Sequence, residues 1–374
     1  MLSLIIFSIF TAFSLYVLIL SAANILTIRF QTGKTGLTDG PRVSVMIPAR
    51  DEEHSISNCL DSLVDQTYLD YEILVIDDQS SDSTWEIISQ YAQKHPNIRA
   101  FKGNSLPEGW NGKSYALHQL AQHASGEIFL FTDADTVHSK ESISLGAANL
   151  ISRGADMVSG YPLQAGPGFI TQIIVSVMHF NTAFLFPLVL SRFTRIPLFA
   201  FAIGQYICIT KNAYFASGGY ERIRSRVTDD IHLARNLLSM GYRIRFIEVH
   251  KTVQCRMFST PAQAFAGITR SIVDFFDCRT SLLISSAVLF CCLIIYPVLA
   301  CLWFLLQGVV ILPLVFGLLA VSLSWAIVVL YLRYPPAAAL FGILMLFLPV
   351  IMIFYGSALL LSGRGIVWKK RYVA

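Results

Sequence analysis

The stretch 127-EIFLFTDADTVHS-139 determines how the rest of the chain is interpreted. Its opening part, Glu127 to Phe131, is almost wholly apolar and predicts a buried strand. Two aspartates one residue apart, Asp133 and Asp135, follow that strand. Two like charges at the end of a buried strand repel each other and lose solvation, and a bound cation would relieve both effects. Acidic pairs at this spacing also occur by chance, so a metal site needs support from the surrounding sequence.

Strands and helices alternate on the N-terminal side of this stretch. Short β-rich runs occupy Arg42 to Ala49, Tyr71 to Ile76 and Asn97 to Phe101. Patterns typical of helices lie between them and after them, over Glu53–Gln66, Ser83–Lys94 and Gly112–Ala124. This order predicts an α/β fold with a doubly wound, mostly parallel sheet.

Polar residues follow three of these strands, and parallel strands bring their carboxyl ends to one edge of a sheet. They are Pro48, Arg50 and Glu52 after the first strand, Asp77 and Asp78 after the second, and Asp133 and Asp135 after the fourth. Asp also favours helix caps, and that alternative explains one such group more easily than all three. Two carboxylates suit Mg²⁺ bound together with a substrate diphosphate. Because the sequence has no glycine-rich phosphate loop, the metal would carry the diphosphate charge.

The composition indicates a membrane protein. Of the 374 residues, 54% are hydrophobic and 14% are charged, which is too apolar for an average soluble domain. Leu2 to Ile28 carries no charge and is long enough for a retained membrane anchor. Two further uncharged runs, Ser281–Leu332 and Ala337–Ser362, have room for three spans.

The net charge of +4 is not gathered into a basic stripe, which argues against nucleic acid as a partner. The seven cysteines form no C-x-x-C pair, which suits a reducing cytosol.

The predicted organisation follows from these runs. It consists of an N-terminal transmembrane helix (1–28), an α/β domain (42–258), an amphipathic interface helix (259–280), C-terminal transmembrane helices (281–362) and a basic tail (363–374). Arg29, Lys34 and Arg42 follow the anchor, and the positive-inside rule then places the α/β domain in the cytosol. The chain is thus expected to be an integral protein of the cell inner or plasma membrane.

Several motifs together resemble family 2 glycosyltransferases of the GT-A fold. They are 45-VMIPARDEE-53, 75-VIDDQSSDST-84, 109-GWNGKSYAL-117, 131-FTDADT-136, 217-SGGY-220 and 227-VTDDIHLAR-235. The GW-x-GK segment, Gly204-Gln205 and Arg256-Met257-Phe258 are similar to the membrane-bound branch that glycosylates lipids such as carotenoids. The resemblance implies a nucleotide-sugar donor, UDP-linked by analogy, and a lipid acceptor that arrives from the bilayer.

The resemblance also implies a role for each matching residue. Pro48, Glu52 and Asp78 would contact the uracil and ribose, and Arg50, Asp77, Gly204 and Gln205 belong to the same donor site. Asp133 would hold ribose or metal, Asp135 would ligate Mg²⁺ or Mn²⁺, and Lys113 would approach the diphosphate. Arg256 would lie near the leaving diphosphate, and Asp230 would be the general base of an inverting displacement, with Asp229 beside it. The alternative that Thr228 or Asp229 only caps the helix Asp229–Met240 is compatible with Asp230 as the base.

One departure from the family pattern bears on the product. Processive synthases carry Q-x-x-R-W, whereas this chain has 253-VQCRMF-258, with Val253 and Met257 in place of the glutamine and the tryptophan. This difference favours a single transfer over polymer synthesis. A processive polysaccharide synthase and a non-catalytic sugar-nucleotide sensor remain alternatives. A transporter is disfavoured because the membrane runs carry no paired ionisable residues.

Two further segments are expected at the membrane interface. Ala165 to Ser191 is long enough to span, but a crossing would separate Asp133 and Asp135 from Asp230. The segment 165–200 is therefore predicted to lie in the interface or re-enter, with a buried core helix as the alternative. Pro261–Cys278 is predicted to be an amphipathic interface helix whose apolar face carries Ala262, Phe265, Ala266, Ile272, Val273 and Phe276.

Two observations conflict about the side of the membrane on which the C-terminus lies. Three C-terminal spans would put the tail outside, whereas its basic residues Arg364, Lys369, Lys370 and Arg371 favour the cytosol. Either one of the runs is re-entrant, or charge does not decide the orientation here.

Overall fold

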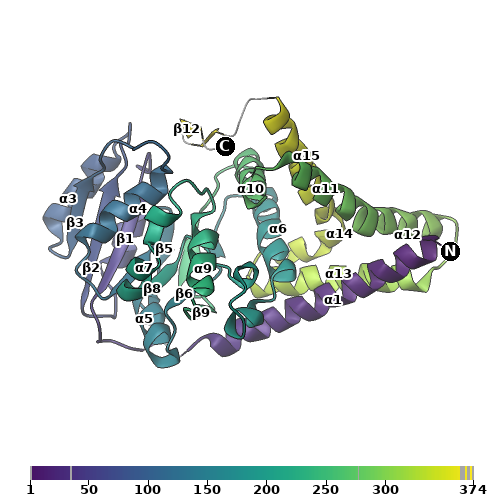
Figure 1. Cartoon of the computed structure of the whole chain (residues 1–374), viewed down its shortest axis with the longest axis horizontal. Helices are drawn as coiled ribbons and strands as arrows, with labels where there is room; N and C mark the ends of the chain where they lie inside the picture. Colours follow the sequence, from purple (N-terminus) through teal and green to yellow (C-terminus); the bar gives the residue numbers. More distant parts are fainter. Residues whose placement is uncertain (1, 34–35, 277, 363–366, 369–370, 373–374) are drawn as a thin grey trace. The chain divides into compact units, whose positions relative to one another are not determined.

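The computed structural model describes residues 2–33, 36–276, 278–362, 367–368 and 371–372. The chain forms two compact units, each built from segments far apart in the sequence (Figure 1). The α/β unit comprises Thr27–Ala165 and Leu188–Met257, and the helical unit comprises Met1–Leu26, Gly166–Pro187 and Phe258–Ala374. Lys34 and most of the predicted basic tail lie outside the described residues.

A seven-stranded sheet with the order β3-β2-β1-β4-β8-β6-β9 forms the centre of the α/β unit. Its strands are β1 (Val43–Ala49), β2 (Tyr71–Asp77), β3 (Ile98–Lys102), β4 (Ile128–Phe131), β6 (Met157–Ser159), β8 (Ile207–Thr210) and β9 (Ile244–Phe246). β1 pairs in parallel with β2 and β4, β2 with β3, and β6 with β9, whereas β8 runs antiparallel to β4 and β6. The predicted α/β class with a mostly parallel sheet is confirmed.

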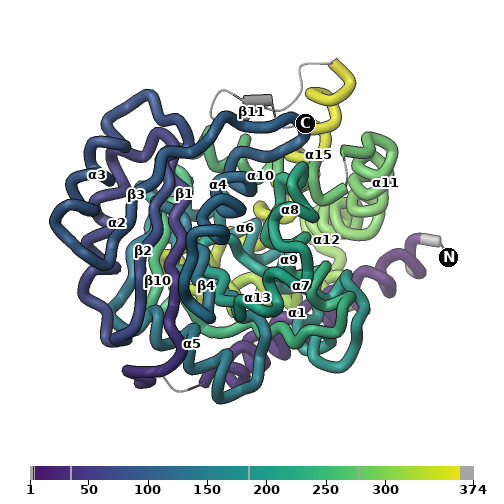
Figure 2. The backbone as a smooth tube through the Cα atoms, turned by 60° about the vertical axis from the view of Figure 1, so that its left-hand side comes forward, coloured from purple at the N-terminus to yellow at the C-terminus, as the bar shows by residue number. Residues whose placement is uncertain are grey.

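Helices cover both faces of this sheet. They are α2 (Ile56–Leu63), α3 (Thr84–Lys94), α4 (Gly112–His123), α5 (Ser142–Arg153), α7 (Lys211–Ala216), α8 (Gly219–Arg222) and α9 (Asp229–Ser239). Side chains of α2, α3 and α5 pack with Val45 and Ile47 on one face, and side chains of α4 and α9 pack with Met46 on the other. Figure 2 shows α2 and α3 on one side of β1 and α4 on the other. Successive residues of β1 therefore face opposite layers, as a doubly wound sheet requires.

The structure also contains a small sheet that the sequence did not predict. It joins β5 (Thr136–His138), β10 (Val253–Cys255) and β7 (Leu163–Gln164) in that order. Strands of two or three residues are too short to show a periodic pattern. The predicted ends of the longer elements are wrong by a few residues. The helix expected from Glu53 begins at Ile56 instead, and the main-chain N–H groups of Glu52 and Glu53 donate to the side chains of Thr84 and Asp82.

Three helices of the helical unit are long and apolar enough to cross a membrane, by the search of the described residues. They are α1 (Leu2–Gln31), whose last residues enter the α/β unit, the continuous pair α11 (Thr280–Phe290) and α12 (Tyr296–Leu306), and α13 (Leu312–Tyr331). A π-helical turn, Cys291–Ile295, joins α11 to α12. Pro297 follows it, and proline lacks the N–H that a regular helix needs at that point.

The last predicted span is broken into two arms. The 3-10 helix η4 (Pro336–Phe341) and α14 (Gly342–Met345) form the first arm, and α15 (Phe347–Leu361) forms the second. The arms are bent by 57° from each other, so a fourth crossing exists only if the bent pair counts as one span. A two-stranded hairpin of β11 (Val367–Trp368) and β12 (Arg371–Tyr372) follows in the sequence.

Two shorter helices complete the helical unit, α6 (Phe169–Leu185) and α10 (Pro261–Phe275). Of the apolar face predicted for the membrane interface, Ala262 and Ala266 are exposed and Val273 is buried within the protein. The residues that α10 buries are Ala264, Gly267, Ile268, Thr269, Val273 and Asp274. A glycine allows close packing on the buried face, because a Cβ on Gly267 would lie 2.4 Å from the Phe258 ring.

Candidate active site

The first two strand ends are held together by main-chain and side-chain contacts. Ala49 lies opposite Asp77 in the parallel register of β1 and β2. The N–H of Asp78 donates to the carbonyl of Ala49 at 2.7 Å. Arg50 donates through Nη1 to the Asp78 carbonyl at 3.0 Å, and the same nitrogen lies 3.7 Å from the Asp78 carboxylate. Pro48 is half-buried at the end of β1, so this group of predicted residues does come together.

The loops that follow β1 and β2 are also joined to each other. The N–H of Ser81 donates to Asp51 at 2.7 Å and lowers the pKa of that carboxyl. The N–H of Glu52 donates to the hydroxyl of Thr84 at 2.8 Å. Asp51 takes a positive φ of 49°, which ordinary side chains rarely adopt. The loops therefore form one hydrogen-bonded rim at the carboxyl ends of the strands.

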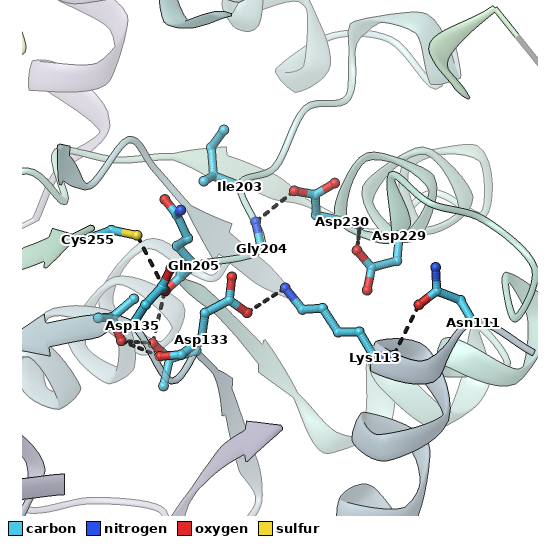
Figure 3. Close-up of polar contacts among 12 residues, drawn as sticks. Asn111, Lys113, Asp133, Asp135, Ile203, Gly204, Gln205, Asp229, Asp230 and Cys255 are labelled. Carbon is cyan, nitrogen blue, oxygen red and sulfur yellow. Dashed lines mark hydrogen bonds and ion pairs between the residues drawn. The ribbon is translucent and has the colours of Figure 1, made fainter. Parts of the chain in front are cut away.

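The turn after β4 carries Asp133 and Asp135, as predicted (Figure 3). The Lys113 ammonium lies 2.5 Å from an Asp133 oxygen, and Cys255 Sγ donates to Asp135 Oδ1 at 3.5 Å. Burial is the largest cause that raises the pKa of Asp135 to about 7, and the charges of Asp133 and Glu52 add to it. The predicted repulsion between these carboxylates is thus present.

A buried polar network supports this turn. Thr136 donates to the main-chain carbonyl of Asp133 at 2.6 Å and lies 2.8 Å from the Thr132 hydroxyl. His138 Nε2 lies 2.9 Å from Thr132 Oγ1, and burial lowers the pKa of His138 to about 3. A neutral imidazole therefore holds the turn without adding charge to it.

Asp229 and Asp230 open α9, as predicted. The N–H of Gly204 donates to Asp230 Oδ2 at 2.7 Å, and the N–H of Asp230 donates to Asp229 Oδ1 at 3.0 Å. Asp229 Oδ2 is buried and has no hydrogen-bond partner among the described residues. Burial raises the pKa of Asp229 to about 7 against the opposing effect of Lys113. The pKa of Asp230 is also raised, chiefly by burial.

Lys113 joins the two groups of acids. It extends from the start of α4, where Asn111 Oδ1 accepts a hydrogen bond from the Lys113 N–H at 3.0 Å. Burial alone would lower the pKa of Lys113, but the charges of Asp133, Asp229 and Asp230 outweigh that effect and raise it. Figure 3 shows the ammonium pointing between these carboxylates.

Other predicted residues contribute differently. Gly204 packs closely against the site, since a Cβ there would lie 3.2 Å from Lys113 Nζ and 3.4 Å from Asp230 Oδ2. Gln205 is buried, and its side-chain oxygen accepts from Gln164 at 3.1 Å. Arg256 is exposed, and its main-chain N–H donates to the carbonyl of Asp135 at 3.2 Å. The structure therefore brings the Arg256 backbone to the aspartate turn.

Sequence reasoning missed Cys255, Gln164 and His138 as parts of the site. Cys255 and Gln164 lie opposite each other in the small sheet, in the register of β10 and β7. The one available signal was the position of Cys255 directly before Arg256 in the motif compared with Q-x-x-R-W.

The donor set fits a divalent cation. A search of the described residues finds no group of three or more His, Cys, Asp and Glu that could hold a metal ion. Asp133 and Asp135 nevertheless supply two hard oxygen ligands, and a cation would offset both the burial of Asp135 and the charge of Asp133, which raise the pKa of Asp135. Mg²⁺ and Mn²⁺ commonly take remaining ligands from a substrate diphosphate and water, so two carboxylates suffice.

Comparisons with known proteins agree with this fold. The family model described as "Glycosyl transferase family 2" matches residues 44–207, and that described as "Glycosyl transferase family group 2" matches residues 128–359. The 4,4'-diaponeurosporenoate glycosyltransferase of Staphylococcus haemolyticus is 27% identical over 226 residues, which cover 58% of this chain and 56% of that protein. The poly(ribitol-phosphate) beta-glucosyltransferase of Bacillus spizizenii is 36% identical over 104 residues, 27% of this chain and 16% of that protein. The matched parts thus span less than two thirds of either relative.

A solved structure has the same fold over nearly the whole chain. It is the mannosyltransferase PcManGT from Pyrobaculum calidifontis in complex with GDP-Man and Mn²⁺. The TM-score is 0.55 at 19% identity, and the alignment covers 98% of this chain and 100% of that one. The second family match covers more than half of the chain and includes both pairs of aspartates, Asp133 with Asp135 and Asp229 with Asp230. The chain therefore belongs to the family 2 glycosyltransferases.

Proposed function

We propose that the protein transfers a sugar from a nucleotide sugar, preferably a UDP-sugar, to a hydroxyl or carboxylate of a membrane lipid, once per acceptor and with inversion. The observation that carries the proposal is the position of Lys113 between two acid pairs from distant parts of the chain. One pair suits the donor diphosphate and its metal, and the other suits the acceptor. Neither a sensor nor a transporter needs a second buried pair of this kind.

Asp230 is the proposed base. It takes the proton from the acceptor oxygen, which forms a bond to the anomeric carbon while the bond from that carbon to the diphosphate breaks. A base on the face opposite the leaving group gives inversion. The raised pKa of Asp230 makes its carboxylate a better proton acceptor than an ordinary aspartate. Asp229 lies beside it with one buried oxygen that has no partner among the described residues, and its charge favours proton transfer to the pair.

The donor site is proposed at the rim of β1 and β2. Pro48, Arg50, Glu52, Asp77 and Asp78 would hold the nucleoside, with the Arg50–Asp78 contact fixing the rim. Gly204 and Gln205 would border the sugar. Lys113, with Arg256 after a side-chain rearrangement, would stabilise charge on the leaving diphosphate.

Asp133 and Asp135 would hold Mg²⁺ or Mn²⁺. Such an ion supplies charge stabilisation on the diphosphate oxygens when it is bound. Lys113 compensates the charge of Asp133 when the ion is absent, and Cys255 orients Asp135 through one oxygen. The solved structure of the mannosyltransferase PcManGT is a complex with GDP-Man and Mn²⁺, which supports this assignment for the fold.

The acceptor and the location follow from the membrane helices. Three described helices are long and apolar enough to span, and the staphylococcal relative is named for a carotenoid acid. We place the α/β unit in the cytosol of a cell whose inner or plasma membrane holds the helices, because Arg29 lies in the last turn of α1 and Arg42 follows that helix. The domain boundaries given from the sequence remain part of this proposal, including an interfacial 165–200 segment.

The test measures nucleotide release by the purified full chain in detergent, with a panel of UDP-sugars, GDP-mannose and total host lipids. We expect release that needs lipid, stops with EDTA, and falls by at least about 100-fold in Asp135→Asn and Asp230→Asn. Asp65→Asn is the matched control, because Asp65 is an exposed acid paired with Lys140 on the surface. Nucleotide binding without turnover on any lipid would favour the sensor, and long products would favour the processive synthase. No nucleotide binding at all would refute the proposal.

A further inference from the structure

The helical unit contains enough contacts to decide on which side of the membrane α15 ends. Thr11 donates to the carbonyl of Pro313 at 2.7 Å, and the Ser21 and Ser324 hydroxyls are also 2.7 Å apart. The later residue of α1 thus contacts the later residue of α13, and the two helices therefore run parallel. We call the near side the side on which α1 ends and the chain passes into the α/β unit. α13 also ends on the near side.

The first arm of the bent pair stays close to the near-side end of α13. Trp325 Nε1 donates to the carbonyl of Ala338 at 2.8 Å, and a Cβ on Gly342 would lie 3.1 Å from the Trp325 side chain. Trp325 lies six residues before the end of α13 at Tyr331, about 9 Å along the helix axis. A crossing needs about 30 Å. The first arm is therefore packed against the near-side part of α13.

The second arm returns to the near side. A Cβ on Gly356 would lie 2.6 Å from Val273 and 3.2 Å from Thr269, both on α10. Leu360 packs against the cluster that includes Val273 and Leu283. α10 leads into α11, and α11 enters the bilayer from the near side, so Leu283 lies in its near-side turns. The last turns of α15 therefore lie beside the point where α11 begins.

We propose that η4, α14 and α15 form a re-entrant pair that dips into the near-side leaflet and returns, so that the described protein crosses the membrane three times. Its partner is the lipid of that leaflet. The residues that the pair exposes are large and apolar: Leu340, Leu344, Ile351, Phe354, Tyr355 and Leu361. The end of α15 at Leu361 then lies on the same side as Arg29. This arrangement removes the conflict between three C-terminal spans and the positive-inside rule.

The re-entrant pair predicts on which sides of the membrane two parts of the chain lie, and this prediction can be tested without measuring catalysis. The loop between α12 and α13 contains Val310, which is exposed, and this loop lies on the far side. The end of α15 lies on the near side. The two points are therefore on opposite sides of the membrane, whichever way the protein is inserted.

The test uses the full chain with one added cysteine, either Val310→Cys or a cysteine appended after Ala374. The unsubstituted chain gives the background from its seven native cysteines. A membrane-impermeant maleimide is applied to intact cells and to permeabilised cells. We expect Val310→Cys to react in intact cells and the appended cysteine to react only after permeabilisation. The reverse result would keep the re-entrant pair but contradict the cytosolic location proposed above. Equal reaction of both cysteines in intact cells, or protection of both, would mean that the bent pair crosses and would overturn the inference.

Discussion

Lys113 compensates three carboxylates at once, so its removal should affect both charge and pH dependence. In Lys113→Met, kcat/KM at pH 7 should fall by about 100-fold or more. A carboxyl with a raised pKa loses its charge as pH falls through that pKa, which is about 7 for Asp229. Loss of the nearby cation raises the pKa further, so the acid limb of the pH–rate profile should move to higher pH.

The pH profile of kcat/KM checks this prediction, with Lys113→Arg as the charge-preserving control. The arginine variant should keep the acid limb of the unsubstituted protein even if its rate falls. An unchanged acid limb in Lys113→Met would show that the lysine does not control the protonation of the catalytic acids.

Cys255 should act through Asp135 on metal affinity. Its thiol donates to Oδ1 and thereby leaves the other oxygen available to a cation. Loss of a partner that orients a metal ligand typically costs 10- to 100-fold in affinity, and a thiol is a weak donor. We therefore expect Cys255→Ala to weaken Mn²⁺ binding by about 10-fold at most.

Electron paramagnetic resonance of free Mn²⁺, titrated in the presence of UDP, measures this affinity without turnover. Cys255→Ser keeps a donor at the same place and should bind Mn²⁺ about as tightly as the unsubstituted protein. Equal weakening in the serine and alanine variants would show that the size of sulfur, rather than hydrogen bonding, matters at this position.

At the scale of elements, Gly356 should determine how closely α15 approaches α10. Alanine in place of glycine within a helix normally stabilises by about 1 kcal/mol. Here the added Cβ would lie 2.6 Å from Val273 Cγ2, and such overpacking typically costs about 1–3 kcal/mol. Gly356→Ala should therefore lower thermal stability in the unsubstituted protein and be neutral or stabilising in a Val273→Ala background. The measurement is thermal unfolding in detergent of the unsubstituted protein, the two single variants and the double variant. Additive effects of the two substitutions on stability would contradict a contact between Gly356 and Val273.

The elements also show how far the sequence determines the structure. β1, β2 and β4 were predictable because each is a buried, apolar run that ends on charged residues, and the parallel pairing of β1 with β2 and β4 then brings those ends together. The contact of Cys255 with Asp135 was not predictable. It joins residues 120 positions apart in the sequence, and Cys255 lies in a strand of only three residues. The close packing of Gly267 against the Phe258 ring was not predictable, because hydrophobicity gives no sign of which glycine faces a neighbouring side chain. The position of the Arg256 guanidinium depends on a flexible exposed side chain that motif spacing does not fix.

At the scale of the whole molecule, the chain passes repeatedly between its two units. α6 belongs to the helical unit although the residues on both sides of it belong to the α/β unit. Its His179 lies 2.8 Å from the hydroxyl of Tyr334, and its Phe180 ring packs against Trp325 at 5.2 Å. Asn24 of α1 donates to the carbonyl of Ala183 at 2.6 Å. Trimming both termini therefore cannot separate a catalytic fragment from α6.

A fragment of residues 27–257 would keep α6 and lose these partners from α1, α13 and the loop after it. Buried side chains such as Val177 and Phe180 would become exposed, and an apolar helix face of this size promotes association. We expect the fragment to aggregate without detergent, whereas the full chain in detergent stays monodisperse in size-exclusion chromatography. The same fragment with Val177→Gln and Phe180→Gln should aggregate less, because the substitutions remove apolar surface without touching the acid pairs. A fragment that stays monodisperse in plain buffer and binds UDP would show that α6 packs within the α/β unit when the other helices are absent.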